Sequence, residues 1–227
     1  MPAPIIKRAH VWPGTVRAAH WIMALAVLVL IATGWVLGRA LYGDTDALIE
    51  AHLTAGYVLA GALGLRAYRL FAGHGAERWR DLVPNALQAG AAGRTLRFYL
   101  TGTRSALPAY YAHNPLWGPL HLLVLIVLLA QCAAGIVMHL GYYRDVLATT
   151  APWIFSLPLP EAHRMAAAVI SAYAAAHVLA VFLHDWKGNG TEVSAMISGT
   201  KYFVVEGEAL RVPEPVQRDG RVEDRED

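Results

Sequence analysis

Four long apolar stretches dominate this sequence of 227 residues. Three of them, residues 18–38, 116–140 and 165–184, contain no Asp, Glu, Lys or Arg. At a rise of about 1.5 Å per residue, each forms a helix of roughly 30 Å or more, enough to cross the hydrocarbon core of a bilayer. The fourth, residues 51–71, reaches this length if Arg66 and Arg69 extend towards the lipid headgroups. The pattern predicts an all-α integral membrane protein, a four-helix transmembrane bundle.

The composition excludes other classes of protein. Hydrophobic residues make up 56% of the chain and charged residues 16%, which argues against a water-soluble enzyme. The one cysteine, Cys132, excludes an internal disulfide and a cysteine-held cluster. No basic patch of the kind that binds nucleic acid is present, nor a phosphate-binding or dinucleotide-binding glycine motif. No catalytic residue is therefore assigned.

The basic residues predict the orientation of the bundle. Seven of the 19 Lys and Arg residues lie between Arg66 and Arg104, and the N-terminal segment adds Lys7, Arg8 and Arg17. Lys and Arg in short loops remain on the cytoplasmic side. We therefore expect an N-in, C-in protein in the bacterial inner membrane.

The end of the chain differs in composition from the rest. Residues 206–227 hold eight of the 17 acidic residues, together with Pro213 and Pro215. Such a segment lacks the apolar surface to fold alone. We expect a membrane domain of residues 1–205, followed by a disordered cytoplasmic tail.

Histidines in the apolar stretches form two pairs at two depths. On the expected topology, His20 and His177 lie towards the cytoplasm, whereas His52 and His163 lie towards the periplasm. Residues 163 and 177 are 14 positions apart, which is roughly 21 Å along one helix, so one helix can serve both levels. Neutral imidazoles are good axial ligands of haem iron, and bundle cores build such sites from facing helices. The pattern predicts two haems between the helices.

Some details of this pattern remain open. His20 lies three residues after Arg17, whereas His177 lies eight before Asp185, so the first pair matches in depth only if the helices tilt or the first helix begins near Pro13. A rival pair, His121 and His139, lies within residues 116–140. The remaining histidines lie at or outside the span boundaries and are expected at the membrane surface: His10, His74, His113 and His184.

Glycines in the first two stretches also fit a flat macrocycle against a helix backbone. They are Gly34, Gly56, Gly61 and Gly64. Close packing of helices through small residues explains them equally well.

Several motifs in the sequence carry a resemblance to a known family. The first stretch reads R-x-x-H-W-I-x-x-L-A-V-x-x-L-x-x-T-G from Arg17 to Gly34. Further matching residues are His163, Arg164, Met165, Ile170, Tyr173 and His177, the segment H-N-P-L at 113–116, M-I-S-G at 196–199 and K-Y-F at 201–203. Over about residues 11–205, the chain resembles the b-type cytochrome subunit of membrane-bound nickel–iron hydrogenases. R-x-x-H-W is shared with the wider bacterial cytochrome b561 superfamily, whereas M-I-S-G favours the hydrogenase branch.

The resemblance implies a ligand set. His20 and His177 are the axial ligands of a haem b iron on the cytoplasmic side, and His52 and His163 those of a second haem b on the periplasmic side. His121 and His139 match no ligand of the family. Arg17, and less directly Arg66, are candidates for contact with haem propionates.

The resemblance also implies a function in electron transfer. Electrons pass from a periplasmic hydrogenase-like iron–sulfur subunit, docked near residues 41–50 and 144–161, to the quinone pool in the membrane lipid. Ala168 and Tyr173 stand where the family usually has tryptophan and phenylalanine, and the first periplasmic loop is short, so we expect the fit to the periplasmic partner to differ from that of the family. The alternative is a free-standing cytochrome b561-type quinone or superoxide oxidoreductase. Residues 192–203, which a free-standing cytochrome does not need, favour the first reading.

Overall fold

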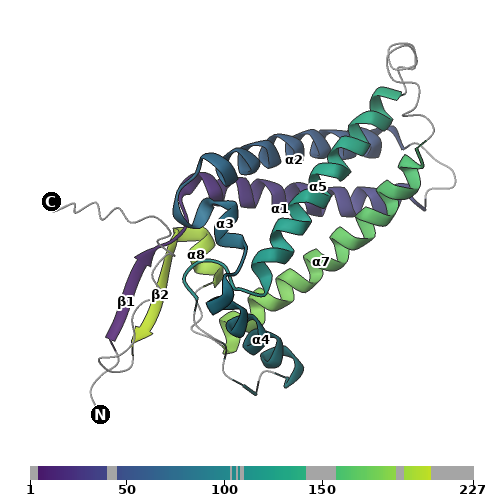
Figure 1. Ribbon diagram of the computed structural model, residues 1–227. Helices are drawn as coiled ribbons and strands as arrows, with labels where there is room; N and C mark the ends of the chain where they lie inside the picture. Colours follow the sequence, from purple (N-terminus) through teal and green to yellow (C-terminus); the bar gives the residue numbers. More distant parts are fainter. Residues whose placement is uncertain are drawn as a thin grey trace.

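The computed structural model describes residues 5–39, 45–102, 104, 105, 107, 110–141, 157–187 and 192–205. Four long helices form its main body: α1 (Gly14–Leu37), α2 (Asp46–Ala72), α5 (Trp117–Gly141) and α7 (Leu159–Lys187). Each is long and apolar enough to cross a membrane. Figure 1 shows α1 and α2 lying side by side, with α5 and α7 crossing them obliquely. The four predicted stretches are thus confirmed as helices, each close to its expected bounds.

The ends of these helices follow from local sequence. Helix α1 begins directly after Pro13, whose fixed φ suits the entry to a helix and where an N–H would have no helical partner. This start near Pro13 agrees with the first helix expected from the depth of the histidines. Helix α2 ends before Gly73, where a Cβ atom would overlap the Arg69 carbonyl oxygen. Only glycine allows the chain to leave the helix in this direction.

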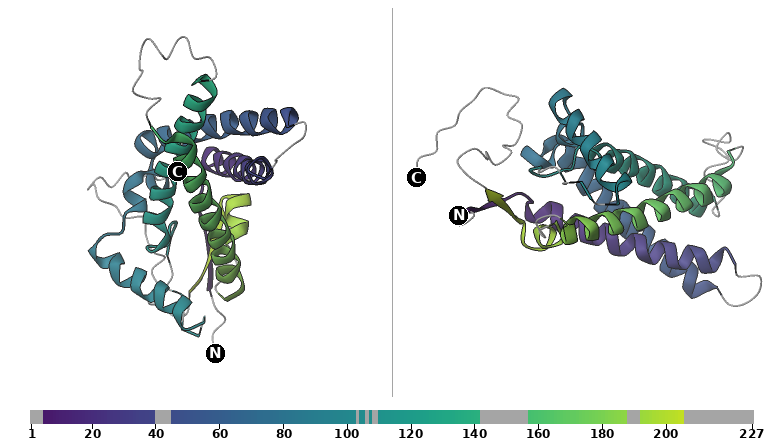
Figure 2. Two further views of the ribbon diagram at one scale, coloured as in Figure 1. Left: turned by 90° about the vertical axis from the view of Figure 1, so that its right-hand side faces the viewer. Right: turned by 90° about the horizontal axis from the view of Figure 1, so that it is seen from below.

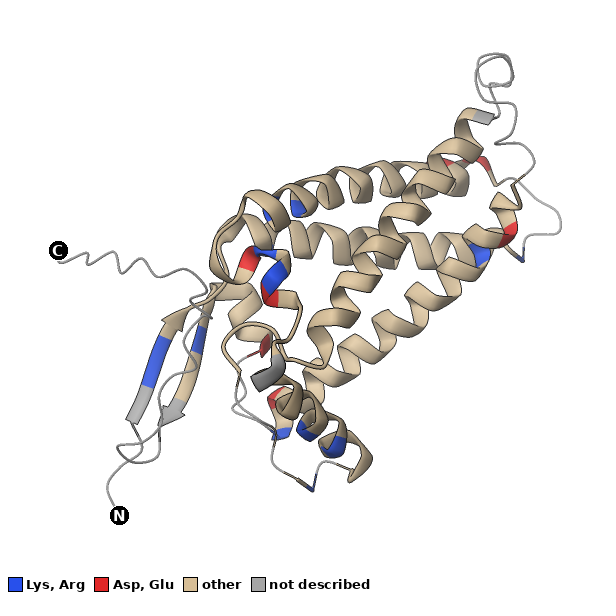
Figure 3. Ribbon diagram, in the orientation of Figure 1, with Lys and Arg blue, Asp and Glu red and all other residues tan. Residues whose placement is uncertain are grey.

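The helices pack around a small core midway along the bundle. Its buried members are Ala26 of α1, Leu59 and Leu63 of α2, Leu128 of α5 and Ile170 of α7. Many of the other large apolar side chains in the four helices are exposed. Figure 3 shows charged residues gathered at the two ends of the bundle, with almost none along its middle. This distribution suits a bundle surrounded by lipid.

One end of the bundle carries several short elements. These are η1 (Gly75–Glu77), α3 (Trp79–Leu82), α4 (Ala86–Leu100), α8 (Glu192–Ser198) and an antiparallel sheet of β1 (Ile5–His10) and β2 (Thr200–Val205). We call this the sheet end; Figures 1 and 2 show that α3, α8 and the strands all lie there. The sequence did not predict these elements.

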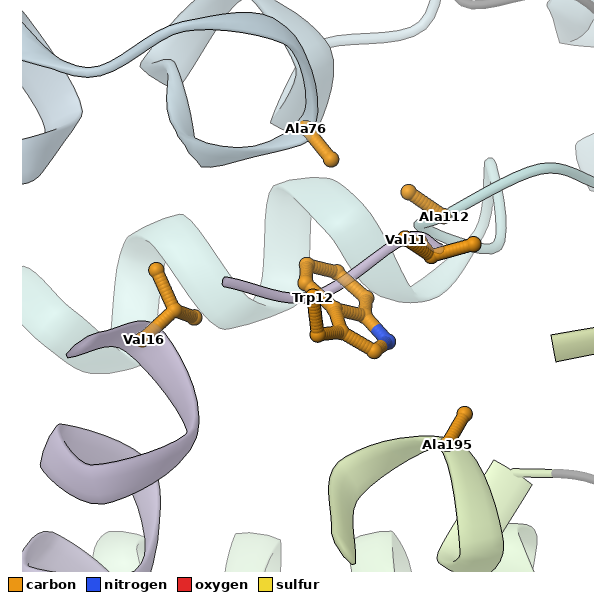
Figure 4. Packing of buried hydrophobic residues seen from close by; sticks show 6 residues of the cluster. All are labelled: Val11, Trp12, Val16, Ala76, Ala112 and Ala195. Carbon is orange, nitrogen blue, oxygen red and sulfur yellow. The ribbon is translucent and has the colours of Figure 1, made fainter. Parts of the chain in front are cut away.

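A second apolar cluster stabilises the sheet end. Trp12 lies at its centre, surrounded by Val11, Val16, Ala76, Ala112 and Ala195, so that four separate parts of the chain meet there (Figure 4). The backbone N–H groups of Val11 and Trp12 donate to the Gly199 carbonyl, at 2.8 and 3.1 Å. Gly199 has a φ of +84°, in the left-handed region that favours glycine. The glycine of M-I-S-G therefore ends α8 and joins it to the N-terminal segment.

Arg66 and Arg69 bind within the protein rather than extending to headgroups. The Arg66 guanidinium is buried and donates to the Glu77 carbonyl at 3.0 Å. The Arg69 guanidinium forms an ion pair with the Glu77 carboxylate, which is almost fully buried. Buried charges are stabilised by such pairing. The two arginines thus fix η1 against the end of α2.

The tail of residues 206–227 lies outside the described residues, as do residues 40–44 and 142–156 of the two loops expected to face the periplasm.

Candidate functional site

Two pairs of histidines face each other across the bundle. The ring centroids of His20 on α1 and His177 on α7 are 6.3 Å apart, with planes at 66°. Those of His52 on α2 and His163 on α7 are also 6.3 Å apart, with planes at 61°. The structure therefore brings together both expected pairs, and α7 contributes one histidine to each.

The separation within each pair suits a metal ion between two imidazoles. A metal–imidazole bond is about 2 Å long, and a ring nitrogen lies about 1.1 Å from its ring centroid, so two trans imidazoles have centroids a little over 6 Å apart. Among the described residues, no group of three or more His, Cys, Asp or Glu side chains could hold a metal ion. The remaining ligands would have to come from the cofactor itself. This donor set fits a haem iron with two axial histidines.

Hydrogen bonds of Thr33 determine which nitrogen of His52 is free. The Thr33 hydroxyl donates to the Val29 carbonyl at 2.7 Å, so its oxygen accepts from Nδ1–H of His52 at 2.8 Å. Nε2 of His52 then carries the lone pair that an iron requires. In metal-binding histidines, the ring nitrogen that does not bind the metal commonly donates a hydrogen bond of this kind. Sequence reasoning assigned no role to Thr33, although Thr33 and Gly34 are the T-G that ends the first motif.

A glycine backs each ring of the second pair. A Cβ atom on Gly34 would lie 3.4 Å from Cε1 of His52, and one on Gly135 would lie 3.3 Å from Cε1 of His163. Gly34 was expected to matter, whereas Gly135 of α5 was missed. The other expected glycines do not contact the histidines: a Cβ on Gly56 would meet only Leu30, and one on Gly61 or Gly64 would have no neighbour within 4 Å.

Residues on either side of His20 bind the end of α8. The Arg17 guanidinium donates to the Ile197 carbonyl, and the Trp21 indole donates to the Met196 carbonyl at 3.0 Å. The motifs R-x-x-H-W and M-I-S-G thus meet in space although they are about 180 residues apart. Nε of Arg17 is buried and has no hydrogen-bond partner among the described residues. A propionate could accept from this nitrogen, whereas Arg66 is already occupied by Glu77.

Aromatic side chains surround His177. Tyr173 stacks on it, with centroids 5.8 Å apart and planes at 9°. The Trp117 ring lies 6.1 Å from it. Neither contact was predicted, because Trp117 lies on another helix and Tyr173 was considered only in comparison with the family pattern.

The rival histidines do not form a pair with each other. His121 lies beside His177, with centroids 5.2 Å apart, closer than two trans imidazoles on one metal ion. Its Nδ1–H donates to the Trp117 carbonyl at 2.5 Å. His139 lies near the other end of α5, where its ring contacts Tyr57 at 6.1 Å.

Two histidines that were expected at the membrane surface are buried at the sheet end. His184 is 5% exposed. Its two ring nitrogens hydrogen-bond to the hydroxyls of Tyr99 and Tyr110. His113 binds the Asp81 carboxylate at 3.2 Å; burial lowers the pKa of His113, and Asp81 partly opposes this effect. Tyr99 and Tyr110 cover His184, and Trp12 and Asp81 contact His113, so both rings are enclosed by tertiary contacts that the sequence did not reveal. His10 and His74 are exposed.

Comparison with known proteins finds relatives along most of the chain. Residues 11–199 match the family described as prokaryotic cytochrome b561. A "Probable Ni/Fe-hydrogenase B-type cytochrome subunit" of Rhizobium leguminosarum bv. viciae is 28% identical over 220 residues, covering 87% of this chain and 90% of that protein. The protein of the same name from Cupriavidus necator is 28% identical over 222 residues, covering 87% and 88%. The "Probable Ni/Fe-hydrogenase 1 B-type cytochrome subunit" of Escherichia coli K12 is 24% identical over 210 residues, covering 84% and 89%. No solved structure matches the chain significantly.

Proposed function

The chain belongs to the prokaryotic cytochrome b561 family of multi-pass membrane proteins, and on that premise we propose that it carries electrons from a periplasmic hydrogenase to quinone. The named relatives are hydrogenase cytochrome subunits that align along most of their length with this chain. The observation that carries the proposal is the pair of matched histidine separations, each 6.3 Å. A family of b-type cytochromes implies haem b, and two such pairs support two haems per chain.

The proposed ligands follow from the geometry of the pairs. His20 and His177 hold the haem at the sheet end, and His52 and His163 hold the haem nearer the opposite end. When bound, haem iron supplies one-electron oxidation and reduction. The chain's own residues orient the imidazoles: Thr33 fixes the tautomer of His52, and Arg17 and Trp21 hold the helix around His20 against α8. Arg17 also offers an unpaired buried Nε to a propionate.

The charge distribution supports an orientation with the sheet end in the cytoplasm. Most of the described Lys and Arg side chains lie at the sheet end, including those of α3 and α4 (Figure 3). The described part of the opposite end has Arg39 and Arg164, together with the acidic residues Asp46, Glu50 and Glu161. By the positive-inside rule, the sheet end then faces the cytoplasm and His52 and His163 lie near the periplasm.

This orientation gives the two pairs different tasks. The periplasmic pair lies where an iron–sulfur donor would dock, and the cytoplasmic pair is roughly 21 Å further along α7. A single haem would leave most of the bilayer between donor and acceptor. The two sites together allow electrons to cross it in two shorter steps.

The proposal can be tested in bacterial membranes that contain the intact hydrogenase complex. Hydrogen should reduce the b haems, which is followed by their absorbance, and it should reduce the quinone pool. In membranes that lack only this chain, hydrogen should still reduce a soluble dye but no longer reduce quinone. If the haems of the intact membranes are reduced by quinol but never by hydrogen, the hydrogenase role is wrong and a free-standing cytochrome is favoured.

A further inference from the structure

A buried chain of hydrogen bonds runs through the sheet end beside His177. The Trp117 indole donates to the Tyr99 hydroxyl at 2.8 Å. The Tyr99 hydroxyl lies 2.6 Å from Nε2 of His184, and Nδ1 of the same ring lies 3.0 Å from the Tyr110 hydroxyl. The Glu192 carboxylate lies near the Tyr110 hydroxyl, close enough to raise the pKa of Tyr110. This series of residues thus joins α4, α5, α7, α8 and the segment before α5.

The indole at the inner end fixes the direction of the hydrogen bonds. An indole N–H can only donate, so the Tyr99 hydroxyl accepts from Trp117 and must direct its own proton to Nε2 of His184. His184 then carries its proton on Nδ1 and donates to Tyr110. The Tyr110 hydroxyl is left to direct its proton towards the nearby Glu192 carboxylate, which can only accept.

The outer end of this series of hydrogen-bonding residues, at Glu192, reaches the protein surface. The Glu192 side chain is 23% exposed and pairs with the Lys201 ammonium at 2.6 Å. Burial and the Glu192 carboxylate raise the pKa of Tyr110 well above its usual range. Burial lowers the pKa of Lys201, and Glu192 opposes that effect. The charged groups that face His184 are therefore Glu192, Asp185 and Lys201, with His177 as the titratable group on its inner side.

The inner end reaches the cytoplasmic pair and the lipid. The Trp117 ring, which binds Tyr99, lies 6.1 Å from the ring of His177. Leu96 and Leu100, on the same helix as Tyr99, are 47% and 78% exposed. Exposed leucines on a short helix beside a membrane bundle indicate contact with lipid. These two leucines place lipid beside the part of α4 that carries Tyr99.

We propose that Glu192, Tyr110, His184 and Tyr99 form a proton pathway that supplies the protons for quinone reduction, with Tyr99 as the final donor to a quinone carbonyl oxygen. This inference rests on the proposed function, because the two electrons that convert quinone to quinol come from the haems. Reduction to quinol also requires two protons, and the pathway takes these protons from cytoplasmic water at Glu192.

One delivery balances as follows. The protonated Glu192 carboxyl gives its proton to the Tyr110 oxygen, and the Tyr110 proton moves to Nδ1 of His184. Nε2 of His184 releases its proton to the Tyr99 oxygen, and the Tyr99 proton moves to the quinone oxygen. Four bonds to hydrogen break and four form. The bond directions in the structure correspond to the state after delivery, with Glu192 ionised, and two deliveries complete one quinol.

The test uses the purified chain with its haems, reduced beforehand with dithionite. The haem absorbance is followed by stopped flow after mixing with decylubiquinone or with ferricyanide, which accepts an electron without a proton. The variants Tyr99→Phe and Tyr110→Phe remove one hydroxyl each and keep the ring, and His184→Gln removes the imidazole. Tyr111→Phe is the matched control, since its hydroxyl donates only to the His10 carbonyl outside the pathway.

The pathway predicts slower oxidation by quinone in the three variants, by about tenfold or more, because a positioned proton donor contributes roughly 10²–10⁴-fold. Oxidation by ferricyanide should be unchanged, and Tyr111→Phe should match the wild type with both acceptors. Wild-type rates with quinone in all three variants would overturn the pathway. Equal slowing with both acceptors would also overturn it, since that result indicates damage to the haem site. A wild-type protein that quinone fails to oxidise would instead refute the proposed function itself, and the pathway with it.

Discussion

Adding a methyl group at Gly135 should weaken haem binding at the pair formed by His52 and His163. Gly135 lies on α5, and a Cβ atom there would be 3.3 Å from Cε1 of the His163 ring. Very few real Cβ contacts are this short, so the ring must move by a few tenths of an ångström. The opposite ring does not follow this movement, because Nδ1 of His52 is held by the Thr33 hydroxyl at 2.8 Å.

The size of this shift sets the expected effect. Metal–ligand distances are held to within about 0.2 Å, so the displacement exceeds what the bond tolerates. Changes in residues that position a metal ligand typically reduce metal affinity by about 10–100-fold. We expect an effect of this order for Gly135→Ala, and loss of the haem for the bulkier Gly135→Leu.

The assay is the ratio of haem to protein after purification in mild detergent, measured as the pyridine haemochrome. The wild type should contain two haems per chain, and Gly135→Leu should contain one. Gly61→Ala is the matched control: it makes the same exchange in a spanning helix, but its Cβ has no neighbour within 4 Å. It should retain both haems. Two haems in Gly135→Leu would refute the assignment of His163 as a ligand beside this glycine.

The remaining predictions concern the ligands, the topology and α8. His163→Ala should remove one haem and His177→Ala the other, while His121→Ala and His139→Ala keep both in the same haemochrome assay; loss of a haem in either of the last two would mean that the pairing is wrong. A fusion reporter active only in the periplasm should be silent after residue 227 and active when inserted near residue 44 or 148, and the reverse pattern would invert the proposed direction of electron flow. Trp21→Phe removes the donor to the Met196 carbonyl, so thermal unfolding in detergent should show a loss of about 1 kcal/mol; an unchanged midpoint would show that this bond does not stabilise α8.

The spanning helices were predictable because their signal is local. A continuous apolar run over about 20 residues requires no knowledge of distant contacts. Helix α2 shows the limit of this signal, since its last turns contain Arg66 and Arg69. The sequence indicated that the helix continues through them, but not that both arginines bind Glu77. That contact depends on the turn at Gly73, which only the folded chain shows.

The parts of the site that sequence reasoning missed all depend on contacts between separate elements. Gly135 is unremarkable in α5 until α7 places His163 against it. His184 was expected at the surface because Asp185 follows it and the apolar run ends there. In the fold, Tyr99 and Tyr110 cover it from two other segments. A polar residue at the end of a span thus needs its tertiary partners before its environment can be judged.

The segment after the last span, residues 192–203, has a structural role that the sequence alone did not indicate. Residues 192–203 were taken to favour a partner-dependent cytochrome, on the ground that a free-standing one does not need them. In the structure, α8 accepts hydrogen bonds from Arg17 and Trp21, and Gly199 accepts them from Val11 and Trp12. The segment therefore holds the first turns of α1 at the depth where His20 meets His177. The segment thus supports the pair at the sheet end, so the choice of electron donor has to be decided at the opposite end of the bundle, where His52 and His163 lie.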